Sequence, residues 1–68
     1  MYERIRELRE AKDLKQKDIA ELLHINQGTY SRYESGYLDI PSSVLITLAS
    51  YYDVSVDYLL GLTNKKKV

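Results

Sequence analysis

The sequence predicts an all-α fold, a compact domain of five helices, on two observations. Apolar residues recur at three- and four-residue spacing along the chain, as in Leu45, Leu48 and Tyr52, and this spacing places them on one face of a helix. The segments that show it are separated by short stretches containing Asp, Asn, Gly or Pro, which interrupt helices. Because the chain has 68 residues, it has room for one core and therefore for one domain.

The first two helices are expected over residues 2–12 and 16–23. The first is highly charged and shows an apolar stripe at helical spacing. The second carries Ile19 and Leu23 one turn apart, so both can face the core. Its start is poorly marked, because Lys15 is an unfavourable N-cap residue.

A turn at residues 24–26 is expected to lead into a third helix over residues 27–35. His24 is expected to take a left-handed backbone conformation, which glycine adopts more easily. Asn26 is a favourable N-cap for the third helix. Gly36 follows the last residue of this segment and suits the end of a helix.

Two further helices complete the predicted domain. Pro41 suits the first position of a fourth helix, and Ser55 is a favourable cap for a short fifth helix that Gly61 ends. We expect the domain to span residues 1–62. Residues 63–68, which contain three consecutive lysines, are expected to form a flexible basic tail.

The third helix has a face that is expected to bind a partner. Tyr30 and Tyr33 lie three residues apart and can both face inward. The opposite face carries a row of polar residues that we call the polar stripe: Gln27, Gly28, Ser31, Arg32 and Ser35. A face kept only for solvation usually carries Glu and Lys, whereas this one combines small residues with two long hydrogen-bonding side chains. Such a surface suits the major groove of DNA.

The composition argues against catalytic and cofactor-dependent functions. The chain has no cysteine and one histidine, and clustered carboxylates are absent, so no metal site is expected. We find no activated nucleophile, no pair of carboxylates and no glycine-rich phosphate loop, so an enzyme is not expected. No cofactor is expected either. The chain also shows no membrane span and no signal peptide, which favours a cytoplasmic protein.

The charge balance is unusual for a protein that binds nucleic acid. The formal net charge is zero, and three of the ten Lys and Arg residues are Lys65, Lys66 and Lys67 in the tail. Residues 1–64 therefore carry seven Lys or Arg against ten Asp or Glu. A DNA-binding function has to be achieved with few cations.

Several stretches follow one another along the chain: Ile5-Arg6-Glu7-Leu8-Arg9, QKDIAELLHI, TYSRYESG and IPSSVLITLASYYDVSVDYLLGL. In their order and spacing the chain resembles the Cro/CI-type (XRE) family of lambda-repressor-like helix-turn-helix domains. This resemblance implies that the helix at residues 27–35 lies in the major groove and that the helix at residues 16–23 crosses above it.

The resemblance also implies roles for individual residues. The residues expected to contact base edges are Gln27, Arg32, Ser31 and Thr29. Those expected to contact phosphates are Gln16, Lys15, Lys17 and Asn26, and Gln16 would also brace Gln27. Arg9 is expected to pair with Glu34 as a structural ion pair.

The chain departs from the family pattern in four places. Lys15 replaces a hydroxyl cap, His24 replaces the turn glycine, and Gly28 occupies a position that is often polar. The loop at residues 37–40 lacks the basic residues that relatives place against phosphates, and such charges supply most of the non-specific affinity. Backbone N–H groups at helix starts can still hold phosphates without formal charge.

Two functions follow from these features. The first is a sequence-specific regulator that binds double-stranded DNA and acts as a transcriptional repressor. The alternative is a protein-interaction module with weak DNA binding, such as an antitoxin or a partner of another regulator. The polar stripe favours DNA, because a protein-binding face would show an aromatic or aliphatic anchor there.

A weak homodimer on a palindromic operator is also expected, because one short helix with few cations contacts too little DNA. The apolar residues near the C-terminus that are expected to form the dimer interface are Val56, Tyr58, Leu59 and Leu62. No small-molecule effector is expected to bind this chain.

Overall fold

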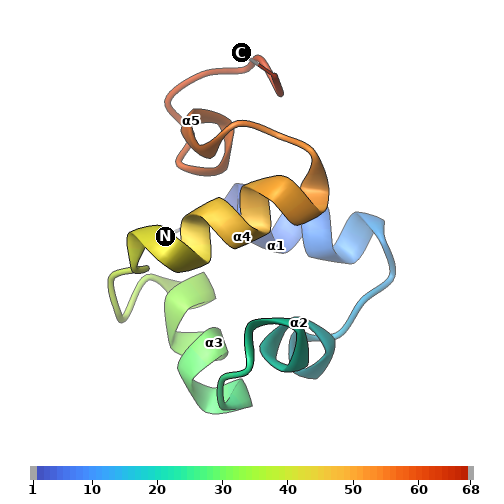
Figure 1. Cartoon of the computed structure of the whole chain (residues 1–68), viewed down its shortest axis with the longest axis vertical. Coiled ribbons are helices and arrows are strands. Elements are labelled where there is room, and N and C mark those ends of the chain that lie inside the picture. Colours follow the sequence, from blue (N-terminus) through green and yellow to red (C-terminus); the bar gives the residue numbers. More distant parts are fainter. Residues whose placement is uncertain (1, 68) are drawn as a thin grey trace.

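The computed structural model describes residues 2–67, which form five α-helices and no strand. Met1 and Val68, at the ends of the expected domain and tail, lie outside this range. The helices are α1 (Glu3–Ala11), α2 (Gln16–Leu23), α3 (Gln27–Ser35), α4 (Ser42–Tyr52) and α5 (Val56–Leu59). In Figure 1, α4 crosses in front of α1, α2 and α3 lie below them, and α5 lies above.

The all-α, five-helix prediction is confirmed, with small shifts in the helix ends. The first helix spans Glu3–Ala11 rather than residues 2–12. Pro41 precedes α4 instead of being its first residue, with extended backbone angles (φ −59°, ψ 149°). Among the helices of residues 2–67, none is both long and apolar enough to cross a bilayer.

The core collects one or more side chains from every helix. The largest fully buried ones are Ile5 from α1, Ile19 from α2, Tyr30 from α3, Leu48 from α4 and Leu59 from α5. Their burial is the main force that holds such short helices together, because helices of this length are marginal on their own. The packing therefore fixes the position of α3 relative to the other helices.

Residues with a left-handed backbone conformation end α2, α3 and α4. His24 after α2 has φ 57° and Gly36 after α3 has φ 84°, as the sequence predicts. Asp53 after α4 has φ 56°, and Asp13, in the turn between α1 and α2, has φ 58°. Aspartate tolerates this region better than most residues do, which explains how the chain makes these turns without glycine.

The start of α2 is stabilised by Asp18, whose role the sequence pattern does not predict. Lys15 has no acceptor in its side chain, so it cannot cap the helix. Instead, the Lys15 backbone N–H donates to Oδ2 of Asp18 over 2.8 Å, and the Asp18 N–H donates to the Lys15 carbonyl over 3.0 Å. Asp18 also places a negative charge in the first turn of α2, which the helix dipole favours.

Residues 63–67, expected to be flexible, contact the rest of the domain at two places. The Lys66 carbonyl accepts the Ser55 N–H and Lys67 pairs with Asp53, while Thr63 and Asn64 contact α1. The Arg4 guanidinium donates to the carbonyls of Tyr58 and Thr63 and to Oδ1 of Asn64. It also lies over the Tyr58 ring, 4.2 Å from its centroid. The structure thus joins the start of α1 to α5 and to the first residues of the tail.

The contact between Asp18 and Lys15 gives a stability prediction. Replacing Asp18 with Ala should lower the free energy of unfolding by about 1 kcal/mol, because the Lys15 N–H loses its partner and the helix dipole loses a charge. Urea denaturation of both proteins measures this difference. Glu21→Ala, which removes an exposed carboxylate from the other end of α2, should cause no loss. Equal stability of Asp18→Ala and the unmodified protein would show that Asp18 does not support the helix.

Candidate nucleic-acid interface

The polar stripe lies on the outer side of α3, opposite the buried Tyr30. Gln27, Gly28, Arg32 and Ser35 are exposed, and Ser31 is half-buried. Thr29 is also half-buried and lies beside the stripe. The polar stripe contains no apolar side chain, so this face of α3 presents mainly hydrogen-bonding groups.

Asn26 fixes the start of this helix. Its Oδ1 accepts the backbone N–H groups of Gly28 and Thr29 over 2.6 and 3.3 Å. A Cβ atom at position 28 would lie 2.9 Å from this same oxygen, so glycine leaves room for the cap. Because the cap uses Oδ1 alone, the Nδ2 group of Asn26 remains a potential donor to a phosphate.

A buried ion pair holds the other end of α3 against α1. Nε of Arg9 donates to Oε2 of Glu34 over 2.9 Å, and Nη2 donates to Oε1 over 3.0 Å. Both residues are buried, with 9% and 5% of their surfaces exposed. This two-point geometry fixes direction as well as distance, because the guanidinium and the carboxylate are both planar. The Arg9 Nη1 group also donates to the carbonyl of Leu14 over 2.8 Å.

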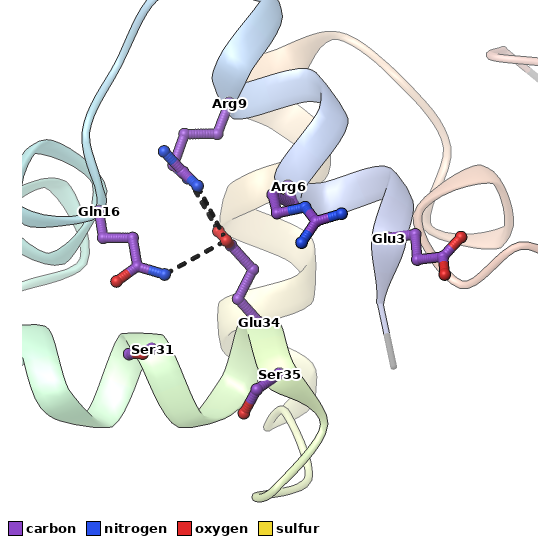
Figure 2. Close-up of a pocket in the computed structure, with 7 residues that line it drawn as sticks. All are labelled: Glu3, Arg6, Arg9, Gln16, Ser31, Glu34 and Ser35. Carbon is purple, nitrogen blue, oxygen red and sulfur yellow. Dashed lines mark hydrogen bonds and ion pairs between the residues drawn. The ribbon is translucent and has the colours of Figure 1, made fainter.

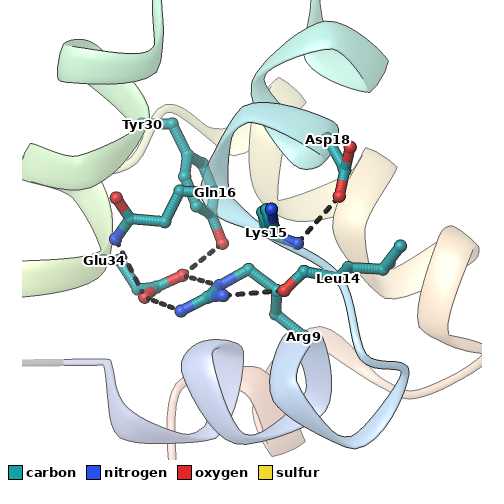
Figure 3. A network of polar contacts seen from close by, with 7 residues as sticks. All are labelled: Arg9, Leu14, Lys15, Gln16, Asp18, Tyr30 and Glu34. Atoms are coloured by element: carbon teal, nitrogen blue, oxygen red, sulfur yellow. Dashed lines mark hydrogen bonds and ion pairs between the residues drawn. The ribbon is translucent and has the colours of Figure 1, made fainter.

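Two more side chains donate hydrogen bonds to the Glu34 carboxylate (Figure 3). The Tyr30 hydroxyl donates to Oε2 over 2.6 Å, and Nε2 of Gln16 donates to Oε1 over 3.3 Å. The amide of Gln16 therefore points toward Glu34 in this structure. Bracing of Gln27 by Gln16 and a phosphate contact from Gln16 remain predictions.

These contacts change the ionisation of the buried groups. Burial opposes ionisation of Glu34, but hydrogen bonds from Arg9, Tyr30 and Gln16 outweigh it and hold its pKa below the ordinary value. The hydrogen bond to Glu34 raises the pKa of Arg9 despite desolvation. Burial, and then the hydrogen bond to Glu34, raise the pKa of Tyr30, so its hydroxyl stays protonated as a donor.

A hollow lies between α1 and α3, next to this network (Figure 2). Two members of the polar stripe, Ser31 and Ser35, form part of its lining. The remaining lining residues are Glu3, Arg6, Arg9, Gln16 and Glu34. The hollow thus opens beside the stripe, and polar or charged side chains surround it.

The comparison with protein families agrees with this geometry. The family model described as "Helix-turn-helix" matches residues 5–59, which include all five helices except the first two residues of α1. The chain belongs to the Cro/CI-type (XRE) helix-turn-helix family. The family resemblance that the sequence suggested is therefore confirmed.

Similar curated proteins come from Bacillus subtilis (strain 168). An uncharacterized HTH-type transcriptional regulator, YobD, is 45% identical over 65 residues, covering 94% of this chain and 58% of its own length. The HTH-type transcriptional regulator ImmR is 41% identical over 58 residues, with coverages of 85% and 46%. The HTH-type transcriptional regulator AnsR is 38% identical over 65 residues, with coverages of 96% and 56%.

The chain spans about half the length of these relatives. Their shared region is thus the helix-turn-helix domain itself. No solved structure matches the chain significantly.

Within this helix-turn-helix domain, few cations lie near the polar stripe. Arg32 is the only cation of α3. Lys15 and Lys17 are exposed at the start of α2, on either side of Gln16. The loop after α3 presents Tyr37, which is 79% exposed, and the exposed Asp39 in place of basic side chains. Any contacts with phosphates must therefore come mainly from α1, α2 and backbone groups.

The four residues expected at a dimer interface have different surroundings. Leu59 is 1% exposed and belongs to the core, so its assignment to the interface is wrong. It belongs to the same core cluster as Leu48 and Tyr52 of α4, where burial of its apolar side chain is favourable. Tyr58 and Val56 are half-buried, and the Arg4 guanidinium covers the Tyr58 ring. Leu62 is 73% exposed and can contact a second copy.

The ion pair between Arg9 and Glu34 gives a stability prediction. Replacing Glu34 with Ala should lower the free energy of unfolding by about 3–5 kcal/mol, because a buried arginine loses its partner. Urea denaturation measures the loss. The double variant Arg9→Met, Glu34→Leu is the control, because it removes both charges together. The double variant should be more stable than Glu34→Ala. An unchanged free energy of unfolding for Glu34→Ala would contradict a stabilising role of the ion pair.

The lowered pKa of Glu34 also predicts a pH dependence. The folded pKa lies below the ordinary value of 4.5, so the unfolded chain takes up a proton first as the pH falls. The contribution of Glu34 is therefore complete above about pH 4.5 and decreases as the pH falls further. The difference in unfolding free energy between the unmodified protein and Glu34→Gln should shrink below that pH. A difference that is independent of pH would contradict the lowered pKa.

Proposed function

We propose that this domain is a sequence-specific regulator of transcription that binds double-stranded DNA with α3 in the major groove. It represses by occupying an operator, so that other proteins are excluded from the same DNA. The observation that carries this proposal is the exposed polar stripe on a helix that a buried ion pair fixes in place. Direct readout needs such a fixed helix, because hydrogen bonds to base edges depend on position and direction.

The chemistry of the stripe matches base edges. Arginine can donate two hydrogen bonds to guanine, and glutamine can both donate to and accept from adenine. Arg32 and Gln27 fill these roles in the proposal. Ser31 can bond to several bases, and the methyl group of Thr29 can contact a thymine methyl. Gly28 lets the start of the helix approach the groove closely.

The start of α2 and the cap of α3 supply contacts to the DNA backbone. Lys15, Gln16 and Lys17 come one after another at this helix start, where N–H groups and the helix dipole favour anions. The free Nδ2 group of Asn26 adds a neutral donor. These contacts position α3 without distinguishing one base from another.

We further propose that two copies bind a palindromic operator as a weak dimer. One domain offers a reading helix of nine residues and a single cation on it, which gives a small contact with DNA. Two domains related by a two-fold axis double these contacts. The exposed Leu62 is a central residue of the proposed interface, with Val56 and Tyr58 beside it.

The readout proposal predicts the effects of two substitutions. Gln27→Ala and Arg32→Ala should each cost about 1–3 kcal/mol at the cognate site and relax the preference at particular base pairs. Titration of each variant against cognate and scrambled duplexes measures this cost. Lys12→Ala, at the residue that follows α1, should change both affinities little. Equal losses on both duplexes would mean that Gln27 and Arg32 hold phosphates and do not read bases.

The dimer proposal predicts cooperative binding. The unmodified protein should bind a duplex with two half-sites much more tightly than one with a single half-site. Leu62→Asp should remain folded, because this side chain is exposed, but should lose the cooperativity. Equally tight binding to one isolated half-site would contradict the dimer. Gel-shift titrations at one fixed salt concentration provide the comparison.

A further inference from the structure

The hollow between α1 and α3 contains an arginine that no role described so far uses. Its lining includes Arg6 and Arg9, and these two cations differ in their partners. Arg9 is held by Glu34 and by the Leu14 carbonyl. Neither of the ion pairs formed within residues 2–67 involves Arg6, which is exposed, and Figure 2 shows its guanidinium over the hollow.

The position of the hollow links it to the polar stripe. Ser31 and Ser35 belong to both, so a molecule that covers the stripe also covers the mouth of the hollow. A DNA duplex seated on α3 would thus bring its backbone past Arg6. Phosphate is the group that such a backbone presents, and arginine binds it through two parallel N–H groups.

The charges around the hollow favour an anion next to Arg6. The carboxylate of Glu34 is neutralised by Arg9 and accepts further hydrogen bonds from Tyr30 and Gln16. Glu3 also lines the hollow, but Figure 2 shows its carboxylate pointing away from Arg6. The hydroxyl of Ser31 adds a neutral donor at the edge, whereas the hydroxyl of Ser35 donates to the Arg32 carbonyl over 3.2 Å.

We propose that Arg6 binds a phosphate of the DNA backbone at this hollow. The inference rests on the proposed function and deepens it, because it assigns a cation to an interface that otherwise has few. Arg6 increases affinity for any duplex and contributes nothing to the choice of sequence. Arg6 of α1 thereby supplies a positive charge that the loop after α3 lacks.

The test is the salt dependence of DNA binding by Arg6→Gln. A lost phosphate contact should weaken binding to cognate and scrambled duplexes by the same factor, about fivefold to tenfold. The plot of log affinity against log salt concentration should become less steep by about 1. Arg6→Lys should keep most of the slope, because it keeps the charge.

Lys12→Gln is the matched control. It removes one positive charge from the end of the same helix, where the ammonium lies 5.6 Å from the centre of the Tyr51 ring on α4. At physiological salt, exposed charges are screened over about 8 Å, so this variant should keep affinity and slope. Equal melting temperatures for all variants would show that folding is unaffected.

The outcomes separate this inference from the proposed function. An unchanged slope for Arg6→Gln, or a loss confined to the cognate duplex, would overturn the phosphate contact. If the unmodified protein bound cognate and scrambled duplexes alike, sequence-specific readout would fail, but a slope reduced by Arg6→Gln would still support the contact. Absence of binding to any duplex at low salt would overturn both.

Discussion

The buried pair of Arg9 and Glu34 is the constraint on which the presentation of α3 depends. It joins the last turns of α1 and α3 by two hydrogen bonds, at 2.9 and 3.0 Å, while Tyr30 and Gln16 occupy the remaining acceptor sites of the carboxylate. A hydrophobic contact alone permits small rotations of a helix, whereas a bidentate pair resists them. Burying two charges is costly unless every hydrogen bond is made. In this network both carboxylate oxygens of Glu34 and all three nitrogens of the Arg9 guanidinium have hydrogen-bond partners, and this restricts the orientation of α3.

The interface that this orientation presents is poor in charge. Affinity for DNA usually comes from Lys and Arg on phosphates, yet α3 carries only Arg32 and the following loop carries none. In our account, backbone N–H groups, neutral amides and Arg6 at the hollow share the task of positioning. Such an interface gains little from non-specific attraction. In the proposed function, specific contacts and the pairing of two copies determine where the protein binds.

The sequence predicted the parts of the fold that depend on local patterns. Helical spacing together with cap and turn residues predicted all five helices, and the cap residues Asn26 and Ser55 perform the predicted role. The pairing of Arg9 with Glu34 came from the family resemblance, since residues 25 positions apart share no local signal. The burial of Leu59 and the contacts of Arg4 with Tyr58 and Asn64 depend on how α1 and α5 meet, which periodicity does not specify. The base and phosphate contacts remain predictions, because they depend on a partner.

The most direct test of the account is a selection of bound duplexes from a random DNA pool, carried out with the unmodified protein at one physiological salt concentration. The account predicts enrichment of a single palindrome whose half-sites lie about one helical turn apart, with guanine and adenine at positions that Arg32 and Gln27 can contact. Recovery of a pool without a shared motif, at concentrations where the protein binds DNA, would contradict it.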